Sequence, residues 1–121
     1  MGMVFQVYIN GTISEVEFYK RAFVAQLGRT GKNEDGTYMH AEIIKDGKCI
    51  MYLSEKADSI IGNSMQFCLT FNGNKSAVEV AYNVLSKDCR ETGMPLGNFP
   101  WGSYGASLVD KYGVDWYIAD R

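Results

Sequence analysis

The feature that most constrains the fold of this chain is an internal repeat. Residues 5–11 (FQVYING) align with residues 67–73 (FCLTFNG) at an offset of 62 positions, and both segments end in Asn-Gly. At the same offset, residues 16–17 (VE) align with residues 78–79 (VE). Similar segments of a repetitive chain generally form the same supersecondary unit. We therefore expect two copies of one unit in tandem.

The later part of each copy supports the same interpretation. Residues 41–44 (AEII) and 51–53 (MYL) align with residues 106–109 (ASLV) and 116–118 (WYI), at an offset of 65 positions. In each half a strand ends at Asn-Gly, a helix follows, and strands rich in β-branched and aromatic residues come after the helix. The pattern predicts an α+β fold of two tandem βαβββ modules.

The length fits one small domain. A chain of 121 residues buries roughly two-thirds of its unfolded surface on folding, so that it needs no disulfide or metal for stability. We predict a single domain over residues 1–121, with module 1 at about residues 1–55 and module 2 at about residues 64–121. Residues 55–63 would then link the modules.

Turn and capping signals place the elements of the first module. Thr12 and Glu15 have the spacing of a capping box, in which two side chains bind backbone amides at a helix start. Asp46-Gly47 is a typical hairpin turn. The expected elements are a strand at residues 4–9, a helix at 12–24, a polar, glycine-containing loop at 28–36, and a hairpin of strands at 38–44 and 49–53.

The second module carries similar signals. Asn72-Gly73 ends its first strand, and apolar residues then recur at helical spacing. Gly93, Pro95 and Gly97 interrupt the chain after the helix. The expected elements are a strand at residues 65–71, a helix at 75–89, and strands at 104–109 and 114–119.

Charge and composition argue against several classes of function. The net charge is −2 and the pI is about 5.3, whereas nucleic acids and anionic membranes are bound by basic surfaces. The apolar runs are far shorter than the ~20 residues that span a bilayer. Residues 1–10 lack the basic and apolar regions of a signal peptide. Three cysteines without C-x-x-C spacing are typical of reduced thiols. We expect a cytoplasmic protein that binds neither nucleic acid nor membrane.

Several short motifs follow one another along the chain in the order found in a known superfamily. They are residues 8–11 (YING), 17–20 (EFYK), 39–42 (MHAE), 101–105 (WGSYG) and 110–113 (DKYG). In these motifs the chain resembles the vicinal oxygen chelate superfamily of glyoxalases, bleomycin-resistance proteins and ring-cleaving dioxygenases, and in particular its PhnB-like branch. The resemblance implies that the two modules form a curved mixed sheet around a concave cavity. It also implies a homodimer.

The resemblance further implies where a metal would bind. Metal-dependent members carry one ligand on the first and one on the last strand of each module, and these positions correspond here to Val4, Tyr52, Gln66 and Tyr117. Valine has no donor atom, and tyrosine and glutamine are poor ligands for Zn, Fe or Mn beside histidine and carboxylate. The chain contains one histidine. We therefore predict no metal and no other cofactor.

Strand alternation predicts which side chains line the cavity. Successive side chains point to opposite faces of a sheet, and the face beneath a helix is apolar. At residues 38–44, for example, Met39, Ala41 and Ile43 would pack against the helix. The opposite positions, together with two aromatic residues of the WGSYG motif, form the predicted ligand-binding set: Gln6, Tyr8, His40, Glu42, Tyr52, Gln66, Cys68, Thr70, Trp101, Tyr104 and Tyr117. This polar, aromatic lining suits a small polar or aromatic molecule.

Two hypotheses of function remain open. In the first, the protein binds a small molecule in a metal-free cavity. In the second, it is an isomerase or lyase of the same superfamily that uses His40 and Glu42, which lie two residues apart and so face the same side of a strand. A metal shared across a dimer, or bound by these two residues, belongs to the second hypothesis. Cys68 has no second histidine or helix N-terminus to activate it, so we expect an inert, buried thiol.

Overall fold

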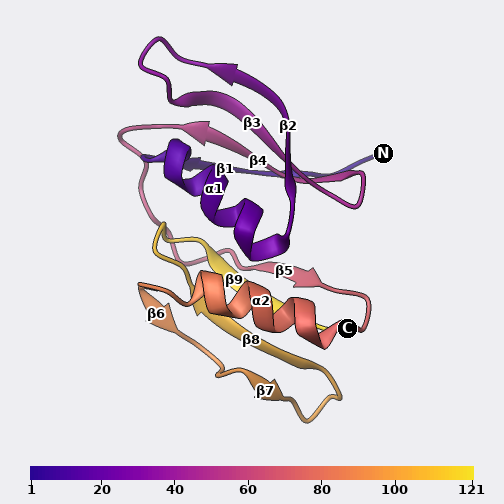
Figure 1. Ribbon diagram of the computed structural model, residues 1–121. Coiled ribbons are helices and arrows are strands. Elements are labelled where there is room, and N and C mark those ends of the chain that lie inside the picture. The colour runs from indigo at the N-terminus through magenta and orange to yellow at the C-terminus, as the bar shows by residue number, and fades with distance from the viewer. The chain divides into compact units, whose positions relative to one another are not determined.

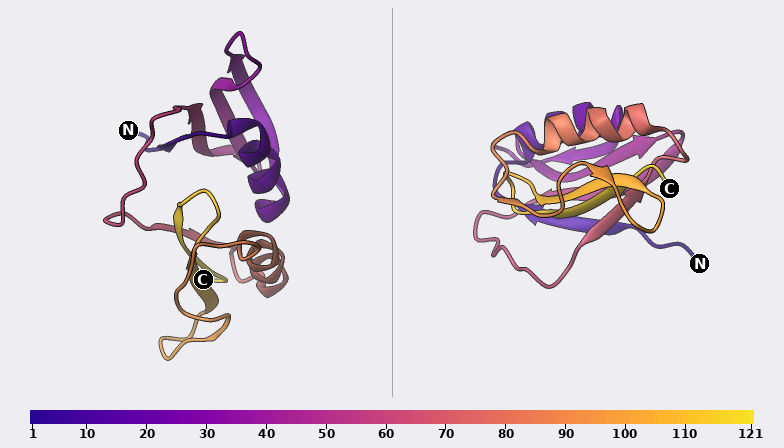
Figure 2. Two further views of the ribbon diagram at one scale, coloured as in Figure 1. Left: turned by 90° about the vertical axis from the view of Figure 1, so that its left-hand side faces the viewer. Right: turned by 90° about the horizontal axis from the view of Figure 1, so that it is seen from below.

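A computed structural model describes all residues of the chain, 1–121. The chain divides into two compact units, Met1–Ile60 and Ile61–Arg121. Each unit contains one helix and one set of paired strands (Figure 1), and each helix lies against one face of the sheet of its own unit (Figure 2). The predicted α+β fold of two βαβββ modules is confirmed. Neither helix has the length and apolar character needed to cross a membrane.

The first unit is a four-stranded mixed sheet covered on one face by a helix. Its strand order is β1-β4-β3-β2, in which β1 and β4 are parallel and the other pairs are antiparallel. Tyr19 and Phe23 of the helix stack with their ring centroids 5.8 Å apart and are buried together with Ile43 and Leu53 of the sheet. The elements are β1 (Phe5–Ile9), α1 (Thr12–Phe23), β2 (Gln26–Lys32), β3 (Tyr38–Lys45) and β4 (Lys48–Glu55).

The second unit repeats this topology with one strand divided. Its elements are β5 (Phe67–Thr70), α2 (Lys75–Leu85), β6 (Glu91–Thr92), β7 (Gly97–Asn98), β8 (Tyr104–Val109) and β9 (Asp115–Ala119). The strand order is β5-β9-β8-β6, and β7 also pairs with β8. Between β6 and β7 lies Pro95, which has no amide hydrogen to donate to a sheet. Trp116 is fully buried in the core of this unit, as are Leu85 and Ile118.

The predicted loop at residues 28–36 is wrong, because its first part belongs to strand β2. This strand lies at the edge of the sheet and is mostly exposed, so its sequence carries no apolar alternation. Its pairing with β3 shifts register twice, between Leu27 and Thr30 and between Gly31 and Lys32. Glycine inside a strand often marks such a bulge. The same residues therefore fit a bulged edge strand as well as a loop.

The predicted capping box at Thr12 and Glu15 is also wrong. Gly11 is the N-cap of α1, and Thr12 is the first helical residue. The free amides of Gly11 and Thr12 donate to the carboxylate of Glu55 at 3.0 and 2.9 Å, and the Thr12 hydroxyl donates to the same carboxylate at 2.6 Å. Glu55 stands at the end of β4. The helix is therefore capped by a residue 43 positions further along the chain than Thr12.

Replacing Glu55 with glutamine is expected to lower the free energy of unfolding at neutral pH by about 1–2 kcal/mol, because a charged acceptor at a helix N-terminus is lost. Burial raises the pKa of Glu55, but hydrogen bonds from Thr12 and Gly11 outweigh burial and hold it below its ordinary value of 4.5. This contribution is complete above that ordinary value and is lost as the pH falls through the lowered pKa. Urea denaturation from neutral to strongly acidic pH measures it.

The control for this experiment is Glu34→Gln, since Glu34 is exposed and caps no helix. An equal effect of both substitutions at neutral pH, or a difference between wild type and Glu55→Gln that persists unchanged in strong acid, would contradict the capping role.

Two side chains predicted to be buried are exposed instead. Met39 is 60% exposed because it is the extra residue of a bulge: Gly31 pairs with His40 and Lys32 pairs with Tyr38, which leaves Met39 without a partner in register. Cys68 is an exposed free thiol on the short edge strand β5. In addition, α2 ends at Leu85, four residues earlier than the predicted helix.

Candidate functional site

In the second unit, the sheet face opposite α2 carries a row of polar and aromatic side chains. Cys68 of β5 pairs in register with Tyr117 of β9, and Tyr117 pairs with Ser107 of β8. Directly paired residues point to the same face of a sheet. Trp116, the neighbour of Tyr117, is fully buried on the helix side. The three paired side chains therefore share the face that the helix leaves open.

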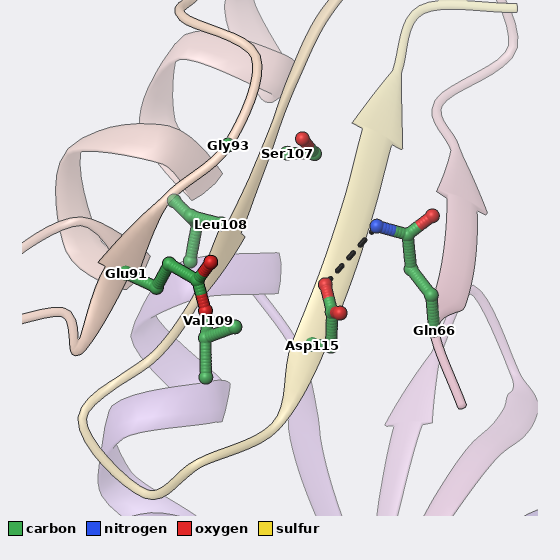
Figure 3. Close-up of a pocket in the computed structure, with 7 residues that line it drawn as sticks. All are labelled: Gln66, Glu91, Gly93, Ser107, Leu108, Val109 and Asp115. Atoms are coloured by element: carbon green, nitrogen blue, oxygen red, sulfur yellow. Dashed lines mark hydrogen bonds between the residues drawn. The ribbon is translucent and has the colours of Figure 1, made fainter. Parts of the chain in front are cut away.

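A second row on the same face runs beside the first. Asp115 of β9 pairs with Val109 of β8, which in turn pairs with Glu91 of β6. Around these residues lies a small open cavity of about 120 Å³, shown in Figure 3. It is lined by Gln66, Glu91, Gly93, Ser107, Leu108, Val109 and Asp115. Of the predicted ligand-binding residues, Gln66 alone lines this cavity.

The cavity has an acidic and polar rim. Gln66, just before β5, donates its Nε2 to Asp115 Oδ1 at 3.0 Å (Figure 3). This bond holds the Asp115 carboxylate at the side of the cavity and leaves its second oxygen without a donor from the protein. Neither Asp115 nor Glu91 has a lysine or arginine nitrogen within salt-bridge distance. The two carboxylates are therefore available to a ligand.

Ser107 supplies a buried hydroxyl to the same cavity. It is 7% exposed, and its Oγ accepts the Met94 amide at 2.8 Å. The hydroxyl hydrogen has no acceptor in the protein and is free to donate to a ligand. Gly93 lets the chain after β6 pass close to Ser107, because a Cβ there would lie 3.0 Å from the Ser107 carbonyl oxygen and closer still to its Oγ. A larger residue at position 93 would displace the cavity wall.

An aromatic cluster lies next to the cavity on the same face. Trp101 donates its indole Nε1 to the Tyr117 hydroxyl at 3.1 Å. Phe99 stacks on both rings, with centroid distances of 4.7 Å to Trp101 and 6.0 Å to Tyr117. Trp101 is 60% exposed. These three residues, here called the aromatic platform, place a flat apolar surface beside the polar cavity, since Tyr117 and Ser107 are register partners.

Two predicted site residues of the second unit lie apart from the cavity. Tyr104 is on the other face of the sheet, where its hydroxyl donates to Glu79 of α2 at 3.4 Å and Lys75 lies 5.6 Å from its ring centre. Burial, and after it the neighbouring Glu79 carboxylate, raises the pKa of Tyr104. Tyr104 lies beneath the helix and is therefore not part of the candidate site. Thr70 is exposed at the end of β5.

In the first unit, the open sheet face carries the remaining predicted residues. Gln6 of β1 donates its Nε2 to the Ser54 hydroxyl at 2.5 Å, which ties β1 to its neighbour β4. Tyr8, two residues further along β1, is 56% exposed. These side chains share a face, as strand alternation predicts.

His40 and Glu42 stand side by side on β3 and face different partners. The His40 ring packs against Tyr52 with centroids 4.9 Å apart. Glu42 Oε1 accepts the backbone amide of Arg29 at 2.9 Å, so this carboxylate helps to hold the bulged strand β2. No hydrogen bond joins the two side chains. Glu42 is thus engaged with the backbone and does not orient the imidazole.

The residues at the four positions that the resemblance assigns to metal ligands do not fit a metal. Val4 has no donor atom, Gln66 is hydrogen-bonded to Asp115, and the Tyr117 hydroxyl accepts the Trp101 indole. Tyr52, the fourth, packs its ring on His40. In neither unit do three or more His, Cys, Asp or Glu side chains come together in a way that could hold a metal ion.

Several residues of this site are not among those that strand alternation predicts. It could have found Ser107, because Ala106 and Leu108 on either side of it are apolar and mark the helix face of β8. Asp115 lies two residues before Tyr117 on β9, so alternation places both on the same face, although Asp115 is not in the predicted set. Glu91 and Phe99 carry no such signal, since Glu91 belongs to a strand of two residues and Phe99 lies outside any strand.

No model of a protein family matches the sequence, and no curated protein matches it. Solved structures do match its fold. Protein PA1353 from Pseudomonas aeruginosa has a TM-score of 0.73 and 20% sequence identity, over 98% of this chain and 96% of that protein. The PhnB protein from Bacillus cereus has a TM-score of 0.70 and 20% identity, over 98% of both chains.

A mutant of the fosfomycin resistance protein FosX from Listeria monocytogenes, solved with Mn(II) and 1S,2S-dihydroxypropylphosphonic acid, also matches. It has a TM-score of 0.68 and 11% identity, over 98% of this chain and 90% of that protein. At such identities the likeness concerns the fold. The chain has the vicinal oxygen chelate fold, the fold of glyoxalase and bleomycin-resistance proteins.

Proposed function

We propose that this protein is a PhnB-like small-molecule-binding protein, and that the open face of its second unit binds a small polar or aromatic molecule without a metal. One observation carries the proposal: the aromatic platform and the polar cavity are contiguous, because Tyr117 of the platform is the register partner of Ser107 in the cavity. A flat ligand stacked on the platform beside Tyr117 can therefore place a polar group within reach of Ser107.

The size of the cavity supports a binding mode in which the cavity holds only part of the ligand. Pockets that enclose a whole small-molecule ligand measure about 300–1,000 Å³, and this cavity has about 120 Å³. It takes up one polar group or one small ring. The rest of the ligand would lie on the platform, where the exposed face of Trp101 offers stacking and apolar contact.

Replacing Trp101 with alanine tests the proposal. Ligands found by thermal-shift screening are expected to bind the variant about tenfold or more weakly, since stacking on an exposed aromatic face contributes roughly 1–2 kcal/mol. Isothermal titration calorimetry measures the affinities. Stability should change little, because Trp101 is 60% exposed. Trp101→Phe is the matched control: it keeps the stacking surface, loses the indole donor to Tyr117 and should retain most of the affinity. Unchanged affinity in Trp101→Ala would contradict the proposal.

We also propose that the protein acts as a homodimer, as the family resemblance implies, and in the cytoplasm, as its cysteines without C-x-x-C spacing lead us to expect. Light scattering at tens of micromolar should then give twice the 13.5 kDa mass of the chain. A mass of one chain at that concentration would contradict the homodimer and leave the binding face unaffected.

A further inference from the structure

We propose that the Asn10-Gly11 turn is a deamidation site whose reaction the Glu55 carboxylate suppresses. The repeat places Asn-Gly between the first strand and the helix of each unit, at Asn10-Gly11 and at Asn72-Gly73. This dipeptide has a chemical reactivity that plays no part in ligand binding. The inference is therefore independent of the proposed function.

Asparagine followed by glycine is open to attack by the backbone itself. The amide nitrogen of the glycine gives up its proton and bonds to the side-chain carbonyl carbon of the asparagine. The side-chain nitrogen takes up a proton and leaves as ammonia. Water then opens the cyclic imide at either of its carbonyl groups, which produces an aspartate or an isoaspartate residue. No enzyme or oxidant is needed, and glycine favours the attack because it has no Cβ to obstruct it.

Both asparagines have side chains that are free to react. Asn10 and Asn72 are exposed, and no hydrogen bond to the protein holds either side-chain amide. The side chains of Asn33 and Asn74, by contrast, are held by hydrogen bonds to nearby residues. The rate of deamidation at Asn10 and Asn72 then depends on the attacking nitrogen of the glycine that follows.

Each attacking nitrogen is held by a hydrogen bond that the reaction must break. The Gly11 amide donates to Glu55 Oε2 at 3.0 Å, and the Gly73 amide donates to the backbone carbonyl of Asp120 at 2.5 Å. A nitrogen whose proton stays on such an acceptor is a poor nucleophile. At Gly11 the acceptor is also charged, and a negative charge beside the amide disfavours the nitrogen anion that attacks.

Deamidation at Asn10 would damage the cap of α1. The new carboxylate would stand next to Gly11, whose amide Glu55 binds, and the two negative charges would repel each other. An isoaspartate would also lengthen the backbone just before the helix. The bond from Gly11 to Glu55 thus protects the turn on which the cap itself depends.

The variant Glu55→Ala tests the inference, with Asn72 as the reference within the same molecule. Peptide mapping by mass spectrometry follows conversion at both sites while the folded proteins are kept at mildly alkaline pH. We expect deamidation at Asn10 to become about tenfold faster than in the wild type, as the loss of a hydrogen bond to a charged group would give. The rate at Asn72 should not change, because its glycine is held by a backbone carbonyl.

Two further variants separate this effect from a general loss of stability. Ile43→Val removes a buried methyl group from the same unit and leaves Glu55 in place, so Asn10 should react as slowly as in the wild type. Glu55→Gln keeps one acceptor oxygen and should give a smaller acceleration at Asn10, and it decides the matter if Glu55→Ala does not fold. An unchanged rate at Asn10 in the Glu55 variants, equal acceleration at Asn10 and Asn72, or equal acceleration in Ile43→Val would overturn the inference.

Discussion

Replacing Asp110 with asparagine is expected to lower the free energy of unfolding of the protein by about 3 kcal/mol, as a broken buried hydrogen-bond network generally does. Asp110 is fully buried. Its Oδ1 accepts the amides of Tyr112 and Val114 at 2.9 and 3.1 Å, and its Oδ2 accepts the indole Nε1 of Trp116 at 2.9 Å. One carboxylate therefore shapes the turn between β8 and β9 and binds the largest core side chain.

The expected loss of stability follows from the number of donors that form hydrogen bonds to Asp110. Asparagine keeps one acceptor oxygen, but its NH2 group is a donor and cannot bind the Trp116 indole. A buried donor left without an acceptor costs about 1–3 kcal/mol, and the remaining bonds lose the contribution of the negative charge. Urea denaturation, followed by tryptophan fluorescence, measures the change. We expect a fall in the melting temperature of roughly 10–15 °C.

The control for Asp110 is Asp88→Asn, at an exposed position of the same unit. Its backbone has a positive φ of 56°, a conformation that asparagine also tolerates. Its stability should stay within about 0.5 kcal/mol of the wild type. A loss of less than about 1 kcal/mol in Asp110→Asn would show that the turn and the indole do not depend on this carboxylate.

Replacing Gly105 with alanine is expected to destabilise the second unit by about 3 kcal/mol or more, because the new methyl group would meet backbone atoms. Gly105 of β8 pairs with Ala119 of β9. A Cβ at this position would lie 2.9 Å from Ala119 Cα and closer still to the carbonyl oxygen of Ile118. Backbone atoms of a paired strand cannot move away without loss of the β8–β9 hydrogen bonds. The clash therefore cannot be relieved without a loss of stability.

Gly97→Ala is a matched control for Gly105→Ala. Gly97 of β7 is the register partner of Gly105 on the other side, and a Cβ there meets nothing within 4 Å. Its substitution should change the free energy of unfolding by less than about 0.5 kcal/mol. Urea denaturation of both variants decides the matter: similar stability of the two proteins would contradict the close approach of β8 and β9 at Gly105.

Much of the fold could be predicted from the sequence because local signals repeat in both halves. Asn10-Gly11 and Asn72-Gly73 each stand between a parallel strand and a helix, and the helix faces show apolar residues at the right spacing. The hairpin at Asp46-Gly47 is a turn that two-residue loops favour. Each of these signals lies within a few residues of the element that it predicts. The local sequence alone is therefore enough to indicate that element.

The features that the sequence did not reveal depend on partners far along the chain. The cap of α1 comes from Glu55, whereas Thr12 and Glu15 have the spacing of a local capping box. Strand β2 is held by pairing with β3 and by the Glu42 bond to the Arg29 amide, while its own residues show no strand pattern. A local sequence pattern cannot distinguish a distant cap from a local capping box, or a bulged edge strand from a loop.

The residues of the candidate site also divide into those that local patterns predict and those that depend on distant contacts. Strand alternation placed Gln66 and Tyr117 on the correct face, because they lie on or beside regular strands with apolar neighbours. Glu91 is brought to the cavity by pairing with Val109, and Phe99 is brought to the aromatic platform by stacking on Tyr117. Both contacts join segments without periodicity of their own. Tyr104 is on the helix face because it shares the alternation of the buried Ala106 and Leu108 on β8.

Binding of the ligand to the open face of the second unit can be tested by NMR mapping of the first compounds found to bind. The chain has two tryptophans, of which Trp101 is 60% exposed and Trp116 is fully buried. We predict that binding shifts the Trp101 indole signal and the Ser107 and Tyr117 amides, while the Trp116 indole changes little. Shifts confined to the first unit, for example at His40 and Tyr52, would contradict the claim.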